Sequence, residues 1–315
     1  MKTVYLVVPC YNEEEVLPET HRRLSEKLAG LVASGEVSPE SRILFVDDGS
    51  RDGTWGLISG YAAGDGRVCG VKLAHNRGHQ NALLAGLMTA MPHCDCAVSL
   101  DADLQDDIDA LDEFLTKFRA GNDVVYGVRR RRDTDGAFKR TTAEGFYKVM
   151  EKLGVEVVYN HADYRLMSRR ALEALSEYGE ANLFLRGIVP SIGYRSDRVY
   201  YDRHERFAGE SKYPLKKMLA FAVDGITSFS VKPLRLISNL GILVSLLSVF
   251  GLLYALISFL CGAAVPGWTA IVGSIWLLGG IQLLCLGVVG TYVGKIYSET
   301  KGRPRYRIEE IAGKL

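Results

Sequence analysis

Short apolar runs alternate with longer segments of mixed polarity through residue 127 of the chain. The apolar runs predict β-strands at residues 4–8, 42–46, 68–73, 97–100 and 123–127. The segments between them predict helices at residues 13–33, 54–63, 80–91 and 108–120. Because strands that alternate with helices pair in parallel within one sheet, we expect an α/β domain.

The pattern changes beyond residue 136. Two further helices and one strand are predicted, at residues 138–153, 169–177 and 195–201. A basic segment, residues 203–217, then leads into residues 214–227, where the pattern predicts an amphipathic helix on a membrane surface. Lys216 and Lys217 in that helix are available to anionic lipid headgroups.

No charged residue occurs in residues 236–294. A membrane-spanning helix needs roughly 20 apolar residues, and Pro266-Gly267 is a turn signal, so two spanning helices are predicted, at residues 236–262 and 268–294. The alternative, a buried hairpin in a soluble core, needs more covering surface than the rest of the chain provides. Lys and Arg cluster outside both ends, which places both ends in the cytoplasm by the positive-inside rule.

These features predict four parts: a cytoplasmic catalytic domain over residues 1–212, an amphipathic juxtamembrane segment over 213–235, two transmembrane helices within 236–294 and a cytoplasmic tail over 295–315. The first apolar run is too short for a signal peptide. We therefore expect a multi-pass protein of the inner (cytoplasmic) membrane whose catalytic domain stays in the cytoplasm. The spacing of Gly290 and Gly294 permits close helix packing, either within the hairpin or in a homo-oligomer.

Several functional classes are excluded by what the sequence lacks. The net charge of +1 provides no general attraction to nucleic acid. A dinucleotide-binding fingerprint, a phosphate-binding P-loop and the Gly-x-Ser-x-Gly motif of serine hydrolases are absent. The predicted spanning helices contain no Asp, Glu, Lys, Arg or His, which argues against an ion-coupled transporter.

Polar residues gather where the predicted strands end. Asp101 and Asp103 follow one strand, Asp47 and Asp48 end another, and Glu13 lies just beyond the first. In parallel α/β sheets, ligands bind beyond the carboxyl ends of the strands, so these side chains are candidates for one site. Two carboxylates in this position suit Mg²⁺ or Mn²⁺, which take further ligands from substrate phosphates. The Asp47-Asp48 pair is expected to form an Asx-stabilised turn and also to bind a base or ribose group.

Six motifs carry a family resemblance. They are Pro9-Cys10-Tyr11-Asn12-Glu13, Val46-Asp47-Asp48-Gly49-Ser50, Asn76-Arg77-Gly78-His79-Gln80, Asp101-Ala102-Asp103-Leu104-Gln105-Asp106, Asp163-Tyr164-Arg165-Leu166 and Arg206-Phe207-Ala208-Gly209-Glu210-Ser211-Lys212-Tyr213. Together they resemble family 2 glycosyltransferases of the GT-A fold. The last two narrow the resemblance to polyprenyl-phosphate glycosyltransferases, the group with dolichol-phosphate mannose synthases and bactoprenol glucosyltransferases. Tyr164 and Asp107-Ile108 depart from the residues usual in the family, which are Phe and Pro respectively.

The resemblance implies a role for each matching residue. The nucleotide-sugar pocket would contain Pro9, Tyr11, Glu13, Asp47, Asp48 and Asp101. A Mg²⁺ or Mn²⁺ ion would be bound by Asp101, Asp103 and Gln105. The diphosphate and the lipid phosphate would be bound by Arg206, Ser211 and Lys212. Arg129 is a further candidate for phosphate binding because it lies at the end of a predicted strand, and not because of the resemblance. The catalytic residues would be Asp163, Asp103 and Arg206.

The resulting hypothesis is a membrane-bound inverting glycosyltransferase. It would move one sugar from a nucleotide sugar, such as UDP-glucose, to undecaprenyl phosphate for cell-envelope glycan modification. A processive polysaccharide synthase is the alternative enzyme, but two spanning helices are too few for a polymer channel. A non-catalytic membrane scaffold that retains the sugar-nucleotide-binding fold is the alternative outside enzymes, and intact Asp101, Asp103 and Asp163 argue against it.

Asp163 has more than one candidate role. A lipid monophosphate is mostly dianionic near neutral pH, because its second pKa is about 6, and it hardly needs a base. Asp163 is therefore expected to orient the acceptor, with the role of a general base as the alternative. Arg165 offers a simpler explanation, which is a structural salt bridge.

Overall fold

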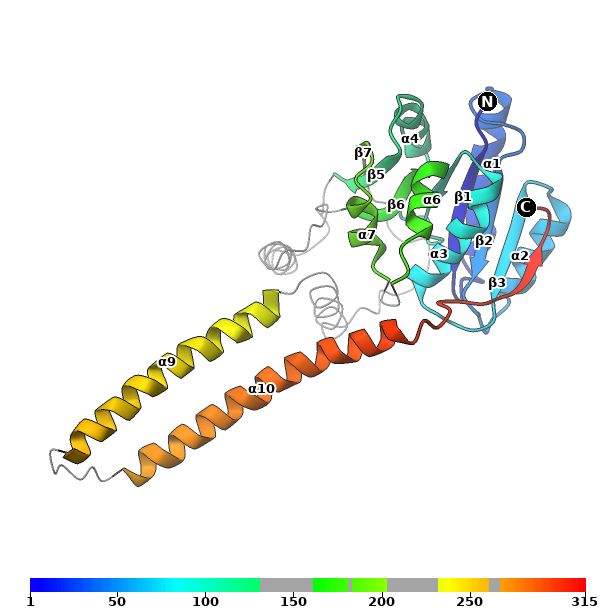
Figure 1. Cartoon of the computed structure of the whole chain (residues 1–315). Coiled ribbons are helices and arrows are strands. Elements are labelled where there is room, and N and C mark those ends of the chain that lie inside the picture. Colours follow the sequence, from blue (N-terminus) through cyan, green and yellow to red (C-terminus); the bar gives the residue numbers. More distant parts are fainter. Residues whose placement is uncertain (131–160, 181–182, 203–231, 261–266) are drawn as a thin grey trace. The chain divides into compact units, whose positions relative to one another are not determined.

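The computed structural model describes residues 1–130, 161–180, 183–202, 232–260 and 267–315 (Figure 1). Within these residues the chain forms two units. The sheet unit holds the strands and includes Arg303–Leu315 at the C-terminus, and the helical unit holds two long helices. The helices predicted at residues 138–153 and 214–227 lie outside the described residues.

The described strands form one eight-stranded mixed sheet. They are β1 (Val4–Cys10), β2 (Arg42–Asp47), β3 (Val68–Leu73), β4 (Cys96–Ser99), β5 (Val124–Arg129), β6 (His161–Ser168), β7 (Ser196–Tyr201) and β8 (Ile308–Ala312), in the spatial order β7-β5-β6-β4-β1-β2-β3-β8. As predicted, β1 pairs in parallel with β2 and β4, and β2 pairs in parallel with β3. β6 and β8, which were not predicted as strands, run antiparallel to their neighbours and make the sheet mixed.

Helices pack on both faces of the sheet (Figure 1). One face carries α1 (Leu17–Ala33), α2 (Thr54–Gly64) and α4 (Ala110–Arg119), the other carries α3 (His79–Ala90) and α6 (Arg169–Ser176), and the connections contain the short helices η1 (Met91–His93) and α7 (Leu185–Ser191). Leu24 of α1, Ile58 of α2 and Phe114 of α4 belong to one buried cluster with apolar strand residues. Full burial of each such side chain stabilises the fold by roughly 1.5–3 kcal/mol.

α3 approaches the sheet closely at Gly86. A Cβ atom at this position would lie 2.4 Å from Val7 Cγ1 and 2.6 Å from Val46 Cγ2, so a larger residue requires the sheet or the helix to shift. This contact fixes α3 against β1 and β2. It also sets where His79, the first residue of α3, lies at the edge of the sheet.

β6 brings a distant chain segment to the carboxyl end of β4. It lies antiparallel between β4 and β5, with Ser99 opposite Arg165. An antiparallel strand begins beside the point where its neighbour ends, so Asp163 near the start of β6 lies beside the end of β4. The alternation of apolar and polar residues predicted no strand here.

The C-terminal residues add an edge strand to the sheet. β8 pairs with β3, and Trp55 Nε1 of α2 donates a hydrogen bond to Glu310 Oε2 at 3.1 Å. The predicted tail, residues 295–315, therefore has two parts. Its first residues continue α10 as far as Thr300, and its last residues belong to the sheet unit.

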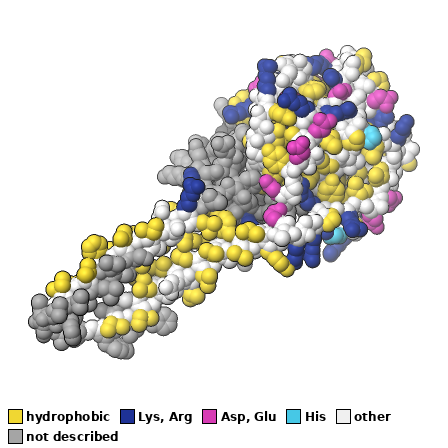
Figure 2. Space-filling view, viewed as in Figure 1, with side chains coloured by type: hydrophobic (Ala, Val, Ile, Leu, Met, Phe, Trp, Pro, Cys, Tyr) yellow, Lys and Arg dark blue, Asp and Glu magenta, His cyan; other side chains and the backbone are white. Residues whose placement is uncertain are grey.

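The helical unit consists of α9 (Lys232–Leu260) and α10 (Trp268–Thr300), which contact each other. Large apolar side chains are exposed along both helices (Figure 2). Examples that are more than half exposed are Leu236, Leu247, Phe250, Ile275 and Leu283. An apolar surface of this extent marks a site of interaction with a membrane or another protein. Among the described residues, Leu277–Thr300 is the one segment that is long and apolar enough to be a candidate membrane span.

Candidate active site

Acidic side chains from three strands meet at one edge of the sheet. Asp47 ends β2, Asp48 follows it, Asp101 follows the end of β4, and Asp163 lies near the start of β6. The main-chain N–H of Asp48 donates to the carbonyl of Cys10 at 2.9 Å, which joins the ends of β1 and β2. This edge is the place where ligands bind in parallel α/β sheets.

Asp101 and Asp103 lie on a turn that α1 holds in place. The main-chain N–H of Gln105 donates to Asp103 Oδ1 at 3.2 Å, and Thr20 Oγ1 of α1 donates to the carbonyl of Ala102 at 2.7 Å. Gln105 is buried at 8% exposure. The three predicted metal ligands, Asp101, Asp103 and Gln105, therefore share one anchored turn.

The turn concentrates negative charge. Burial raises the pKa of Asp101 to about 6, with further contributions from nearby carboxylates and an opposing one from His79. These carboxylates belong to Asp106, Asp163 and Asp103. Mutual repulsion of part-buried carboxylates favours a bound divalent cation, and oxygen ligands are the kind that Mg²⁺ and Mn²⁺ take.

The turn fits an ion that also takes ligands from a substrate. Among the described residues, no three His, Cys, Asp or Glu side chains form a metal-binding group by themselves. Mg²⁺ in nucleotide sites is bound through one or two carboxylates plus phosphate oxygens. The carboxylates of Asp101 and Asp103 match that pattern.

Arg129, which was predicted to bind phosphate, lies beside the same turn. It ends β5, and its Nη2 lies 3.3 Å from Asp106 Oδ1. Tyr201 donates a hydrogen bond to that oxygen at 2.5 Å and accepts one from Arg129 Nε at 3.4 Å. The Arg129 side chain is 22% exposed, so it is a fixed cation that an anion can still reach.

Asp163 lies between two guanidinium groups. Arg165 Nη2 donates to Asp163 Oδ1 at 2.6 Å, and Arg186 donates from Nη2 to Oδ2 at 3.0 Å and from Nε to Oδ1 at 3.3 Å. Burial alone would raise the pKa of Asp163, but Arg186 and Arg165 outweigh it and hold the pKa below its ordinary value. The salt bridge to Arg165 that the sequence offered as an alternative is therefore present, and Asp163 is ionised at neutral pH.

His79 lies between Asp163 and the turn that carries Asp101. Its Nε2 lies 3.6 Å from Asp101 Oδ1 and 3.8 Å from Asp163 Oδ2. Asp48 fixes the loop before it, because the main-chain N–H groups of Arg77 and Gly78 donate to the two oxygens of Asp48 at 2.7 and 2.8 Å. His79 was noted in the sequence only as part of a motif, without a role.

Most of the residues predicted for the nucleotide pocket lie at or just beyond the ends of β1 and β2. Tyr11 is 41% exposed and Pro9 is buried in β1. The main-chain N–H of Glu13 donates to Thr54 Oγ1 at 3.0 Å. Asp47 is fully buried, and its Oδ1 accepts from the main-chain N–H of Ser50 while Oδ2 is buried without a hydrogen-bond partner. The predicted Asx-stabilised turn at Asp47 is thus present.

Three predicted residues, Arg206, Ser211 and Lys212, lie outside the described residues. Their assignment to phosphate binding and catalysis stays a prediction. Other residues at the edge had no role assigned from the sequence: His79, Asp106, Arg186 and Tyr201. The sequence before Arg186 has little apolar periodicity, so it does not indicate that Arg186 belongs to the site. The contact between Arg186 and Asp163 in the folded chain does.

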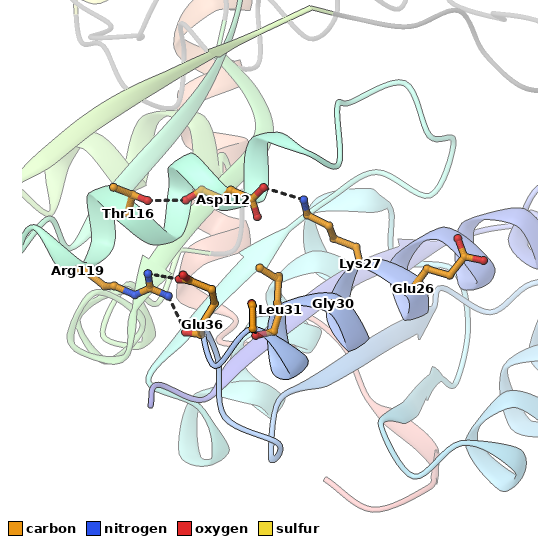
Figure 3. A pocket seen from close by; sticks show the side chains of 9 residues that line it. Glu26, Lys27, Gly30, Leu31, Glu36, Asp112, Thr116 and Arg119 are labelled. Atoms are coloured by element: carbon orange, nitrogen blue, oxygen red, sulfur yellow. Dashed lines mark hydrogen bonds and ion pairs between the residues drawn. The ribbon is translucent and has the colours of Figure 1, made fainter.

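A pocket lies between α1 and α4, and none of the carboxylates at the sheet edge lines it (Figure 3). Its charged side chains are paired with neighbouring side chains. Lys27 Nζ lies 2.9 Å from Asp112 Oδ2, and Arg119 pairs with Glu36. Because these charged side chains already have partners, the pocket is a poorer candidate for a ligand-binding site than the sheet edge.

Residues 5–176, which span the sheet edge from β1 to α6, match the family described as glycosyl transferase family 2. The chain belongs to glycosyltransferase family 2. This membership confirms the predicted enzyme class, a glycosyltransferase, and the mixed α/β sheet agrees with the predicted GT-A fold.

Relatives of this family 2 member extend over nearly its whole length. The "Uncharacterized glycosyltransferase YkoT" of Bacillus subtilis (strain 168) is 54% identical over 96% of this chain and 90% of its own. The "Bactoprenol glucosyl transferase" of Shigella phage SfX is 40% identical over 97% of this chain and 98% of its own. A solved structure, mannosyl-3-phosphoglycerate synthase from Rubrobacter xylanophilus, has a TM-score of 0.47 at 17% identity and covers 76% of this chain and 75% of that one.

Proposed function

We propose that this family 2 glycosyltransferase transfers a single sugar from a nucleotide sugar to undecaprenyl phosphate or another polyprenyl phosphate. The observation that carries the proposal is the 40% identity, over 97% of this chain, to a protein named bactoprenol glucosyl transferase. A UDP-sugar such as UDP-glucose is the proposed donor. The lipid-linked sugar would serve cell-envelope glycan modification.

The helical unit supports a membrane-bound acceptor. α9 and α10 expose apolar side chains along their lengths, and Leu277–Thr300 is a candidate span. We propose that both helices cross the inner membrane, so that the protein is multi-pass. Lys and Arg outside both ends favour a cytoplasmic sheet unit, where nucleotide sugars are available.

The reaction needs two anions to approach each other. An oxygen of the acceptor phosphate forms a bond to the anomeric carbon, and the bond from that carbon to the diphosphate breaks with the electron pair leaving on the diphosphate. Attack from the opposite side inverts the anomeric centre. The acceptor phosphate is largely dianionic near pH 7, so no proton has to be removed from it.

The residues at the sheet edge match these needs. Asp101, Asp103 and Gln105 would hold Mg²⁺ or Mn²⁺, which when bound neutralises charge on the diphosphate. Arg129, fixed by Asp106, provides a second positive charge beside that turn.

The nucleoside would lie at the ends of β1 and β2. Tyr11 presents an exposed ring on which a base can stack, and Glu13 lies two residues further on. Asp47 and Asp48 shape this end of the sheet through the turn at Ser50 and the loop at Arg77.

The test uses the full chain in lipid nanodiscs with UDP-glucose, undecaprenyl phosphate and either Mg²⁺ or Mn²⁺. Release of UDP together with a lipid product one hexose heavier, seen by mass spectrometry, is the expected result. Products with several sugars would favour a processive synthase. If sugars from a panel of UDP- and GDP-sugars bind to the protein but none of them is cleaved to release its nucleotide, a non-catalytic scaffold is favoured.

A further inference from the structure

Arg186 is held in place by contacts of its own side chain and of the residue before it. The main-chain N–H of Leu185 donates to Gln80 Oε1 at 2.9 Å, and its carbonyl accepts from Arg165 Nη1 at 3.3 Å. The Arg186 guanidinium then meets Asp163 through two hydrogen bonds. A cation fixed in this way loses little conformational entropy when it binds an anion.

Two guanidinium groups of unequal exposure contact Asp163. Arg165 and Arg186 both form an ion pair with this carboxylate. Arg165 is 1% exposed, whereas Arg186 is 31% exposed. Of the two guanidinium groups, Arg186 is therefore the one that an incoming anion can reach.

Arg186 and Arg129 contact residues on opposite faces of the sheet. Tyr164 of β6 packs against Phe114 of α4, and successive strand residues point to opposite faces, so Asp163 points toward the α3 face. Arg129 contacts Tyr201, which belongs to the buried cluster on the α4 face. An inverting transfer needs separate sites for the acceptor phosphate and the leaving diphosphate, and two separately anchored arginines are candidates for these two sites.

We propose that Arg186 binds the phosphate monoester of the acceptor and that Asp163 is the positioning residue that holds Arg186 for this contact. The proposal deepens the proposed function and rests on it. It assigns Arg129 and the metal-binding turn to the donor diphosphate. His79, which lies between Asp101 and Asp163, separates the two phosphate sites.

The test compares Arg186→Ala, Arg186→Lys and Asp163→Asn in the nanodisc assay, with KM measured separately for undecaprenyl phosphate and UDP-glucose. Arg186→Ala should raise the acceptor KM by about 10- to 100-fold, the range for loss of one charge-assisted hydrogen bond, and leave the donor KM within about twofold. Arg186→Lys should recover part of the loss. Asp163→Asn should raise the acceptor KM less, and combining it with Arg186→Ala should add nothing further.

Arg170→Ala is the matched control, because Arg170 is 66% exposed and pairs with Asp123 at the other end of β6. It should change neither KM. A rise in the donor KM alone on Arg186→Ala would overturn the proposal in favour of a diphosphate site, and unchanged constants in a variant with wild-type melting temperature would overturn it outright. If the wild type makes no lipid-linked sugar, the proposed function fails instead, and binding of undecaprenyl phosphate to wild type and Arg186→Ala still tests the site.

Discussion

Ser99 of β4 lies opposite Arg165 of β6 in the antiparallel pairing of the two strands. The Ser99 hydroxyl also donates hydrogen bonds to the carbonyls of Asp163 and Arg165. This register aligns the end of β4, which leads to Asp101, with the start of β6, which contains Asp163. A shift by one residue would turn Asp163 to the other face of the sheet and separate it from Arg186.

Asp103→Ala should abolish sugar transfer while the protein still folds. Asp103 lies on the turn that concentrates carboxylates, and its loss removes one of two charged ligands from the proposed metal site. UDP release in nanodiscs measures the effect, with melting temperature as the control for folding. Removing divalent metal from the wild type with a chelator should have the same effect, and full activity after that treatment would contradict a metal role.

Asp163→Asn should lower the rate without changing the shape of the pH–rate profile. The pKa of Asp163 is held below its ordinary value, so the carboxylate is already ionised at every pH above that value. Any acid limb seen between about pH 5 and 7 therefore belongs to another group, such as the acceptor phosphate with its second pKa of about 6.

The alternative role for Asp163 makes a different prediction. A general base contributes about 10²- to 10⁴-fold to the rate, and its removal deletes its ionisation from the profile. Loss of the acid limb in Asp163→Asn, with the limb intact in Arg186→Ala, would show that Asp163 accepts a proton.

The lowered pKa of Asp163 also affects folding stability. The ionised Asp163 carboxylate stabilises the fold at pH values above its unfolded-state pKa, and this stabilisation is lost as the pH falls through the folded-state pKa.

Local patterns were sufficient to predict the first half of the sheet. β1 to β5 and the helices between them follow from alternating apolar runs, and the carboxylates of Asp47 and Asp101 were expected at the strand ends because parallel strands end at one edge. β6 and β8 were missed because their partners are remote in the sequence. β6 pairs with β4 across more than sixty residues, as Ser99 and Arg165 show, and nothing local to residues 161–168 indicates this pairing.

The same limit applies to the candidate site. Asp163 was singled out by resemblance, but its two arginine partners could not be ranked from the sequence. Arg165 is two residues away and was recognised as a partner, whereas Arg186 reaches Asp163 only through the fold of α7 against β6. His79 was noted within a motif, yet its position between Asp101 and Asp163 depends on how closely α3 packs at Gly86.

Asp48→Ala should destabilise the protein and lower kcat. Both oxygens of Asp48 accept main-chain hydrogen bonds, from Arg77 and Gly78, and the side chain is 2% exposed. Leaving these donors without acceptors should cost about 1–3 kcal/mol and displace His79. Asp48→Asn keeps one acceptor and should cost less. A rise in the UDP-glucose KM without loss of stability in either variant would point instead to direct nucleotide binding by Asp48.

Gly313→Ala should lower the melting temperature because it disturbs the docking of β8 on β3. Gly313 has φ of +78°, a left-handed conformation, and a Cβ there would lie 2.8 Å from the carbonyl oxygen of Val68. The conformation alone costs an alanine roughly 1–2 kcal/mol, and the contact with a main-chain atom adds to that cost. Differential scanning fluorimetry of the full chain measures the change.

Gly302→Ala is the matched control for this prediction. Gly302 also has positive φ, at +55°, but a Cβ there meets no atom within 4 Å. Both variants therefore carry the conformational strain, and only Gly313→Ala carries the clash with β3. A larger loss of melting temperature in Gly313→Ala than in Gly302→Ala is expected if β8 is part of the folded sheet. Equal losses would mean that the strand after α10 contributes nothing to the stability of the sheet unit.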